Sequence, residues 1–250
     1  MYLPIGLFGV SVATATLPAV SRQHTLDDHE AVRDTIANGL SLMLMLNIPA
    51  TVGLFVLAVP IVRVIYERGE FTQADTLATA TALQFYAIGL LAYSVVRIVS
   101  PVFYALGRNR TPVIVSATTV LVNASLNYAL VRVLGFRGLA LGTSIAALFN
   151  AVVLVTLLRR HLGGLHEGRI LGSFARMLVA ATLMGLVAVF TERALLSWLP
   201  GHGLVTQIVR LASTIGVAIA VLAAASWLLR IREFSEGVAL VTRRLKRTPR

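Results

Sequence analysis

Seven apolar stretches, each long enough to cross a bilayer, dominate this 250-residue chain. A transmembrane helix needs about 20 consecutive apolar residues to span roughly 30 Å of hydrocarbon. The stretches are separated by short segments rich in charges, Gly and Pro, and the alternating pattern of an outer-membrane barrel is absent. They lie at about residues 1–20, 37–59, 76–106, 111–131, 138–158, 171–191 and 204–229. The sequence therefore predicts an all-α, polytopic membrane helix bundle of about seven transmembrane helices, with the second helix broken near its middle by Asn47 and Pro49.

The composition excludes a soluble globule and several kinds of chemistry. Charged residues make up 13% of the chain, against roughly 25% in a soluble domain, and hydrophobic residues reach 57%. Lys and Arg number 22 and Asp and Glu 11, but the basic residues lie between and after apolar runs. They therefore indicate membrane topology and anionic headgroups rather than nucleic acid. The chain has no cysteine, which excludes disulfides, thiol nucleophiles and Cys-ligated metals.

The distribution of basic residues predicts the orientation. With the C-terminus in the cytoplasm, the inner segments hold 15 Lys and Arg and the outer segments hold 5, while Arg97 and Arg210 lie within spans. An odd number of spans then places residue 1 outside, although it already lies at the edge of an apolar run. No basic region or small-residue cleavage site marks residues 1–20 as a signal peptide. We therefore expect the second half of a longer protein; a seven-helix protein with a translocated N-terminus is the alternative.

Acidic and histidine side chains are predicted to lie only in loops and at helix ends. Proton relays and intramembrane aspartyl catalysis both need a carboxylate within a helix, and none of the 11 Asp and Glu falls inside a predicted span. The one metal-like cluster is His24, Asp27, Asp28 and His29, which is better explained as a helix cap beside solvated charges. We therefore predict no metal site and no enzyme. A polytopic membrane glycosyltransferase or acyltransferase would need an Asp, Glu or His constellation that is not evident.

Arg97 is the charge that lies deepest in a predicted span. It precedes Arg108 by 11 residues, or roughly 16 Å along a helix, which snorkelling covers only in part. Tyr86, Tyr93, Arg97 and Tyr104 are spaced by 7, 4 and 7 residues and share one helix face. Arg97 should therefore face protein or a wet cavity, where its forked donors suit a phosphate-bearing substrate. The alternative is an arginine that is tied to backbone carbonyls and only holds the bundle together.

Two neighbouring spans carry a second polar cluster. Asn123 and Asn127 are one helical turn apart, and Thr143 follows on the next span after a short loop. Their three neutral oxygens could help bind Na⁺ or could hydrogen-bond across the helix interface, and the second explanation is favoured.

The C-terminal tail, 232–250, has a pattern of its own. Phe234, Val238, Val241 and Leu245 recur at spacings of 4, 3 and 4, with Lys and Arg on the other faces. This pattern predicts a basic amphipathic helix that lies on the inner leaflet and contacts anionic headgroups.

Three motifs, in this order and spacing, resemble those of one transporter family. The first runs from Pro4-Ile5-Gly6-Leu7-Phe8-Gly9-Val10 to Leu17-Pro18-Ala19-Val20-Ser21-Arg22, the second is Glu67-Arg68-Gly69-Glu70-Phe71-Thr72, and the third is Pro101-Val102-Phe103-Tyr104-Ala105 followed by Thr111-Pro112. The sequence resembles the MurJ/MviN family, the peptidoglycan lipid II flippases of the multidrug/oligosaccharidyl-lipid/polysaccharide exporter superfamily. The likeness is clear over about 1–160 and rests mainly on hydropathy over 170–250.

The resemblance implies a fourteen-helix flippase fold, in which two six-helix lobes surround a central cavity and a final helix pair forms a lipid groove. This chain would hold helices eight to fourteen and lack the N-terminal lobe and the seventh helix. Residues 1–160 would then form the C-terminal transport lobe, truncated at its start. Residues 161–231 would form two additional transmembrane helices that line the lipid groove, and 232–250 the cytoplasmic tail.

The implied function is transport of lipid II, the undecaprenyl-pyrophosphate-linked precursor, across the bacterial inner membrane for cell-wall synthesis by alternating access. Arg97, Tyr86, Tyr93 and Tyr104 would line the cavity, and the loop residues Glu67, Arg68, Gly69, Phe71 and Thr72 would lie at the outer gate. Some members bind a cation near the region of Asn123, Asn127 and Thr143, so Na⁺ is a candidate, with no other cofactor expected. The partners would be lipid II, membrane lipids and the missing lobe. A related drug or polysaccharide-lipid exporter, or a non-transporting scaffold, remains the alternative.

Overall fold

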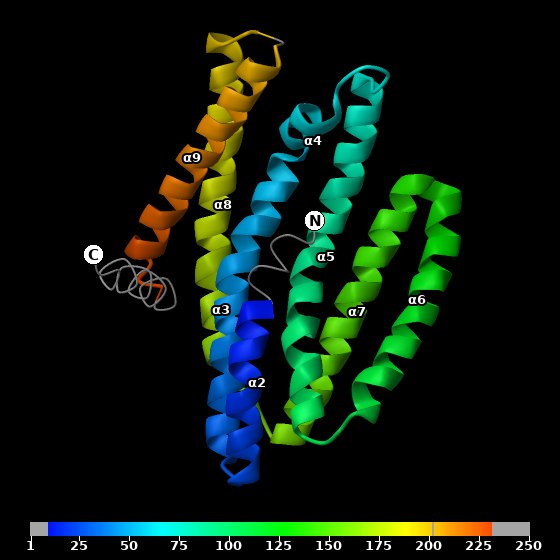
Figure 1. Ribbon diagram of the computed structural model, residues 1–250, viewed down its shortest axis with the longest axis vertical. Helices are drawn as coiled ribbons and strands as arrows, with labels where there is room; N and C mark the ends of the chain where they lie inside the picture. Colours follow the sequence, from blue (N-terminus) through cyan, green and yellow to red (C-terminus); the bar gives the residue numbers. More distant parts are fainter. Residues whose placement is uncertain (1–9, 202, 232–250) are drawn as a thin grey trace, which may run out of the picture.

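The protein is a bundle of α-helices. The computed structural model describes residues 10–201 and 203–231 and contains helices but no strand in those ranges (Figure 1). This confirms the predicted all-α fold class. The helices are α2 (Val10–Thr25), α3 (His29–Val56), α4 (Ala58–Tyr66), α5 (Gln73–Ala105), α6 (Arg110–Leu134), α7 (Phe136–Leu162), α8 (Glu167–Trp198) and α9 (Leu204–Leu228).

Six of the described helices are long and apolar enough to cross a membrane, namely α3 and α5 to α9. They correspond to six of the seven predicted spans. The remaining span, 1–20, is described only from Val10, where α2 begins. The predicted tail helix, 232–250, lies outside the described residues. The chain is therefore an integral membrane protein whose helices follow its hydropathy.

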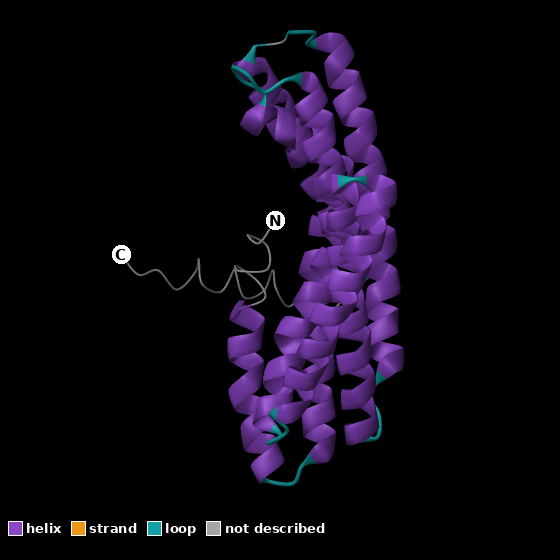
Figure 2. Cartoon of the chain, turned by 90° about the vertical axis from the view of Figure 1, so that its right-hand side faces the viewer, coloured by secondary structure: helices purple, strands orange, loops and turns teal. Residues whose placement is uncertain are grey.

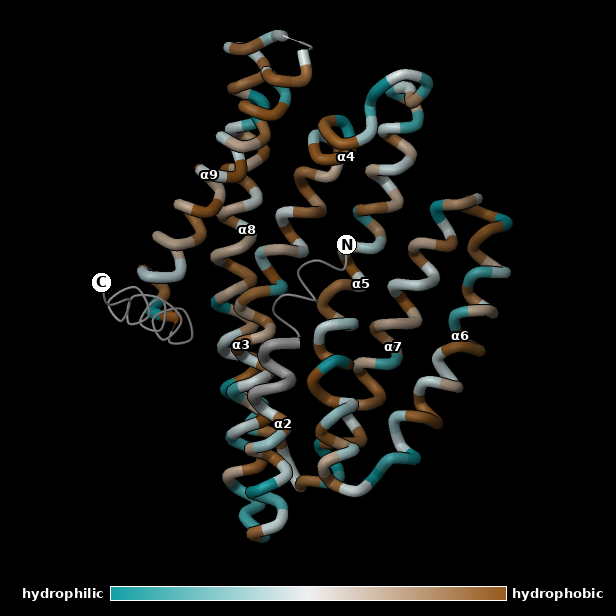
Figure 3. Tube along the Cα trace, viewed as in Figure 1, coloured by the Kyte–Doolittle hydropathy of each residue, from teal (hydrophilic) through white to brown (hydrophobic). Residues whose placement is uncertain are grey.

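The helices form a curved slab in which neighbours pack side by side. The contacts follow the order α9, α8, α3, α5, α7 and α6 across the slab, and α2 packs against both α3 and α5 (Figures 1 and 2). Hydrophilic residues gather in the loops that join the helices (Figure 3). One end of the slab holds the α2–α3, α5–α6 and α7–α8 turns, and the other holds the α4–α5, α6–α7 and α8–α9 turns. We call them the α2–α3 end and the α6–α7 end.

Helix α3 joins two separate hydrophobic clusters. On one side, Ile36 and Met43 pack with Phe103 of α5 and with α2 and α7. On the other side, Ile48 packs with Met177 of α8 and with α9. Helices α8 and α9 therefore attach to the rest of the bundle mainly through α3.

The predicted break at Asn47 and Pro49 is wrong, because α3 continues through both residues. The Asn47 Nδ2 donates to the Met43 carbonyl at 3.0 Å inside the helix. The helix axis is interrupted at Leu57 instead, where α3 ends and α4 begins. Pro60 lies in the first turn of α4, where a missing backbone N–H costs little, so this proline is compatible with a new helix starting at Ala58.

Candidate functional site

The four predicted cavity residues lie along one face of α5. Helix α5 is continuous from Gln73 to Ala105, so the spacing of 7, 4 and 7 places them on one side. Arg97 and Tyr104 are exposed, whereas Tyr86 and Tyr93 are partly buried. Helices α3 and α7 pack against α5, and Tyr93 itself packs beside Ala92 against Ala147 and Ala151 of α7. The cavity candidates therefore share a side of α5 that the described helices leave open at Arg97.

Arg97 makes no ion pair or hydrogen bond within residues 10–201 and 203–231. A guanidinium in a membrane-spanning helix needs water, an anion or backbone carbonyls around it. The structure shows no carbonyl contact to Arg97 from the described helices, and the role of Arg97 stays a prediction. The position suits a cation that is exposed to a wet cavity and free to bind phosphate.

Arg210, by contrast, is an arginine whose charge is paired inside the bundle. Its partner, Glu192, was not predicted from the sequence. The Arg210 Nε lies 3.6 Å from the Glu192 Oε1, and both side chains are almost fully buried. The Thr214 hydroxyl donates to the other Glu192 oxygen at 3.1 Å, and the Arg210 Nη1 donates to the Leu199 carbonyl at 3.3 Å. This network joins α8 to α9 near the α6–α7 end.

The expectation that no carboxylate lies inside a helix is wrong at Glu192. Helix α8 extends to Trp198, beyond the predicted limit at 191. A hydropathy window ends at a charged residue, but a helix does not have to end there when the charge is paired within the bundle. Arg210, a second arginine inside a predicted span, was the signal that a buried partner had to exist.

The predicted cation residues divide into a bonded pair and a separate hydroxyl. The Asn127 Nδ2 donates to the Asn123 Oδ1 at 2.8 Å within α6. The Asn127 Oδ1 is buried without a hydrogen bond and faces Gly142 of α7, where an added Cβ would lie 2.4 Å from it. The Thr143 hydroxyl donates to the Leu139 carbonyl of its own helix at 2.7 Å. The two asparagines thus belong to the α6–α7 packing interface, and Na⁺ binding by these residues stays a prediction.

The predicted gate loop is a hydrogen-bonded corner between α4 and α5. The Glu67 Oε2 lies 3.3 Å from the Arg63 Nε and accepts from the Thr76 hydroxyl at 2.8 Å, which ties the two helices together. The Arg68 Nη2 donates to the Val64 carbonyl at 2.9 Å. These contacts explain why acidic and basic residues are needed at this corner.

The rest of the motif completes the same corner. Gly69 has a φ of +58°, which glycine adopts without steric cost. Thr72 and Asp75 form a reciprocal capping box at the start of α5. The Phe71 ring packs 5.9 Å from the Tyr66 ring, measured between centroids. The structure therefore accounts for the motif by local geometry, and its role as an outer gate stays a prediction.

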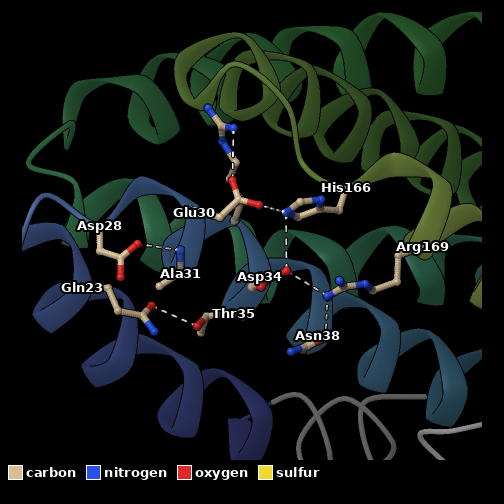
Figure 4. Close-up of polar contacts among 10 residues, drawn as sticks. Gln23, Asp28, Glu30, Ala31, Asp34, Thr35, Asn38, His166 and Arg169 are labelled. Carbon is tan, nitrogen blue, oxygen red and sulfur yellow. Dashed lines mark hydrogen bonds and ion pairs between the residues drawn. The ribbon is translucent and has the colours of Figure 1, made fainter.

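A network of ion pairs joins α3 to the start of α8 at the α2–α3 end (Figure 4). The His166 Nε2 lies 3.2 Å from a Glu30 oxygen and 3.4 Å from an Asp34 oxygen. The Arg169 Nη1 donates to the same Asp34 oxygen at 2.9 Å and to the Asn38 Oδ1 at 3.4 Å. These residues are 128 or more positions apart in the sequence, so no local pattern could have paired them.

The metal-like cluster of the sequence serves a structural purpose. Asp28 is the N-cap of α3 and accepts from the Ala31 N–H at 3.0 Å. Asp27 pairs with His29 at 3.2 Å. No group of three or more His, Asp or Glu that could hold a metal occurs in the described part of the chain.

Comparison with known proteins identifies the family. The family model described as "Lipid II flippase MurJ" matches residues 1–231. The chain belongs to the lipid II flippase MurJ family. A solved structure described as "Lipid II flippase MurJ, inward closed conformation" superposes with a TM-score of 0.70 and 27% identity, covering 91% of this chain and 45% of that chain. The predicted family and fold are thereby confirmed.

Two curated MurJ relatives show how much of the family fold is present. A probable lipid II flippase MurJ from Rickettsia prowazekii is 32% identical over 236 residues, which are 94% of this chain and 46% of the relative. One from Vibrio cholerae is 32% identical over 231 residues, 92% of this chain and 43% of the relative. The chain spans about half the length of the MurJ relatives it matches.

Proposed function

We propose that this chain supplies the C-terminal half of a lipid II flippase, which moves the lipid-linked precursor from the cytoplasmic to the outer leaflet by alternating access. The observation that carries the proposal is Arg97, an exposed guanidinium within the apolar span α5 of a MurJ-family chain, with no ion pair to any residue that the structure describes. A diphosphate headgroup offers the oxygens that such a guanidinium binds through two parallel hydrogen bonds. The reaction is transport, with no covalent change in the cargo.

The cavity would lie against the open face of α5. Arg97 would hold the diphosphate, and the phenols of Tyr86, Tyr93 and Tyr104 would supply further hydrogen bonds along the same face. An N-terminal lobe would supply the opposite wall and further positive charge. The polyprenyl tail would stay in lipid along α8 and α9, which pack on the far side of α3.

Orientation follows from the basic residues. The α2–α3 end would face the cytoplasm of a bacterial inner membrane, together with the C-terminus, because most Lys and Arg flank this end. The corner of Glu67 to Thr72 would then lie at the outer gate. Na⁺ bound near Asn123, Asn127 and Thr143 would offer one means of coupling the cycle to an ion gradient.

The experiment joins this chain to the N-terminal half of the Vibrio cholerae relative, in cells depleted of their own lipid II flippase. Growth and the amount of lipid II exposed on the outer leaflet are measured. We expect the chimera to restore both. Arg97→Ala should lower the rate of exposure by about tenfold or more, since a hydrogen bond to a charged group contributes about 1.5–3 kcal/mol. Arg132→Ala, an exposed arginine at the α6–α7 end, is the matched control and should transport normally.

Other outcomes would favour the alternatives. A chimera that inserts and exports another polysaccharide-lipid or a drug, without restoring lipid II exposure, would support a related exporter. A chimera that inserts and transports nothing would support a scaffold. Normal lipid II transport by the Arg97→Ala chimera would refute the role of Arg97 while leaving the flippase assignment intact.

A further inference from the structure

The carboxylates that the structure describes at the α2–α3 end all interact with other groups of the chain. Each one that the structure describes there has a partner, either a basic side chain or the backbone of a helix N-terminus. The pairs are Asp27 with His29, Asp28 with the Ala31 N–H, Glu30 with Arg33 and His166, Asp34 with His166 and Arg169, and Glu167 with Arg159. The contacts of Glu30 and Asp34 with His166 and Arg169 join α3 to the start of α8 (Figure 4), and the pair of Arg159 and Glu167 joins α7 to α8.

Four arginines at the same end have no such partner. Arg22 lies in the last turn of α2, Arg108 and Arg110 lie at the α5–α6 turn, and Arg160 lies in the last turn of α7. All four side chains are exposed, and none forms an ion pair with a carboxylate among residues 10–201 and 203–231. We call these four residues the basic rim.

The basic rim surrounds the end of one hydrophobic cluster. Val20 of α2, Leu106 after α5 and Leu158 of α7 are buried together, and each precedes a rim arginine by two residues. The ends of α2, α5 and α7 therefore pack against one another close to these arginines in the sequence, and their positive charges add up at this end of the bundle.

An apolar surface continues from the basic rim along α6. Val113 and Ile114 follow Arg110 within one helical turn and are 61% and 63% exposed. The only buried residues of α6 are Pro112 and Val115. Because this chain is an integral membrane protein, positive charge at a helix end beside exposed aliphatic side chains matches the two parts of a phospholipid, an anionic headgroup and its acyl chains.

We propose that the basic rim binds the headgroups of anionic phospholipids, with their acyl chains on the Val113 and Ile114 surface of α6. The surface lies at the bundle end, away from the exposed face around Arg97, and differs from the predicted tail site at 232–250. The four guanidiniums supply forked donors to the phosphate oxygens, and the described carboxylates of this bundle end are paired with other groups. Lipid binding here does not require transport.

The experiment places a fluorescent probe beside the basic rim. Trp198 and Trp227, the 2 tryptophans of the chain, are replaced by Phe, and Val113→Trp introduces the probe. The protein is reconstituted in phosphatidylcholine containing either brominated phosphatidylglycerol or brominated phosphatidylcholine as the quencher. We expect phosphatidylglycerol to quench more strongly at equal mole fraction, and high salt to reduce the difference.

Charge-removing variants then test the site. A variant with Gln at all four positions of the basic rim should have a preference for phosphatidylglycerol that is lower by about fivefold or more. Its substitutions are at Arg22, Arg108, Arg110 and Arg160. The matched control removes the same number of charges at the α6–α7 end, with Arg68, Arg132, Arg137 and Arg193 replaced by Gln, and should keep the preference. Replacing the four arginines of the basic rim by Lys should keep most of the preference for phosphatidylglycerol. Because this variant changes the same positions but keeps the charge, it separates the effect of lost charge from that of misfolding.

Three results would overturn the proposal. The first is a preference for phosphatidylglycerol that survives the four Gln substitutions at the rim. The second is an equal loss in the control set, which would mean that net charge rather than the basic rim attracts the lipid. The third is loss of the preference in the Lys set with helical content unchanged.

Discussion

Glu192 of α8 and Arg210 of α9 form an ion pair of 3.6 Å, with only 13% and 6% of their side chains exposed. The pair is closed by the Thr214 hydroxyl and the Leu199 carbonyl, so both charges have further hydrogen-bonding groups. A buried pair of this kind specifies which helices meet, because neither charge is tolerated there without the other. It holds α8 and α9 as one hairpin that packs on α3.

Removing one partner of this pair should be strongly destabilising. Arg210→Met leaves the Glu192 carboxylate buried and uncompensated, and we expect it to lower the free energy of unfolding by about 3 kcal/mol or more. The double variant Glu192→Gln with Arg210→Met should recover much of that loss. Equilibrium unfolding in detergent measures both. Equal stability of the single and double variants would show that the two residues are not coupled.

Gly142→Ala should be destabilising. An alanine Cβ would lie 2.4 Å from the Asn127 Oδ1, so Gly142→Ala must displace Asn127 or separate α6 from α7, at a cost of about 1–3 kcal/mol. Gly216→Ala is the matched control, because a Cβ at Gly216 in α9 meets no atom within 4 Å. The control should be neutral or stabilising, as alanine has the higher helix propensity. Thermal unfolding of the two variants should therefore shift in opposite directions or differ clearly in size.

Glu67 should control the order of the α4–α5 corner. Glu67→Ala removes the contacts to Arg63 and Thr76, and we expect a loss of about 1 kcal/mol together with faster amide hydrogen exchange from Glu67 to Thr76. Glu70→Ala, exposed and without a contact in the described part of the molecule, is the control. Unchanged exchange in the Glu67 variant would mean that the capping box alone orders the corner.

The Asp34 network should contribute little to stability and should depend on salt. The Asp34 and Arg169 side chains are 45% and 47% exposed, so solvent screens their interaction. Asp34→Asn should cost less than about 1 kcal/mol at low ionic strength, and the difference from the unsubstituted chain should shrink at high salt. Melting temperatures at two salt concentrations test this, and a large salt-independent loss would contradict it.

Much of the architecture follows from the sequence alone. The spans 76–106, 111–131, 138–158 and 204–229 agree closely with α5, α6, α7 and α9, because the transfer of an apolar run into lipid depends mainly on local composition. The shared face of Arg97 and the three tyrosines also follows from helical periodicity, since α5 is continuous. One of the three motifs that indicate the family, Glu67 to Thr72, forms the local corner between α4 and α5 and ends at Thr72, the N-cap of α5.

Only the tertiary structure decided which polar groups meet. Helix periodicity carries no information on which faces of different helices come together. Contacts of this kind are Glu192 with Arg210, His166 with Asp34, and the Asn127 amide with Gly142. Packing also decided that α3 continues through Pro49 and that α8 continues past a carboxylate at 192. In each case the cost of a missing backbone donor or a buried charge is offset by neighbouring residues of the bundle. The sequence determined where the chain enters the membrane, and contacts between helices determined how it is held there.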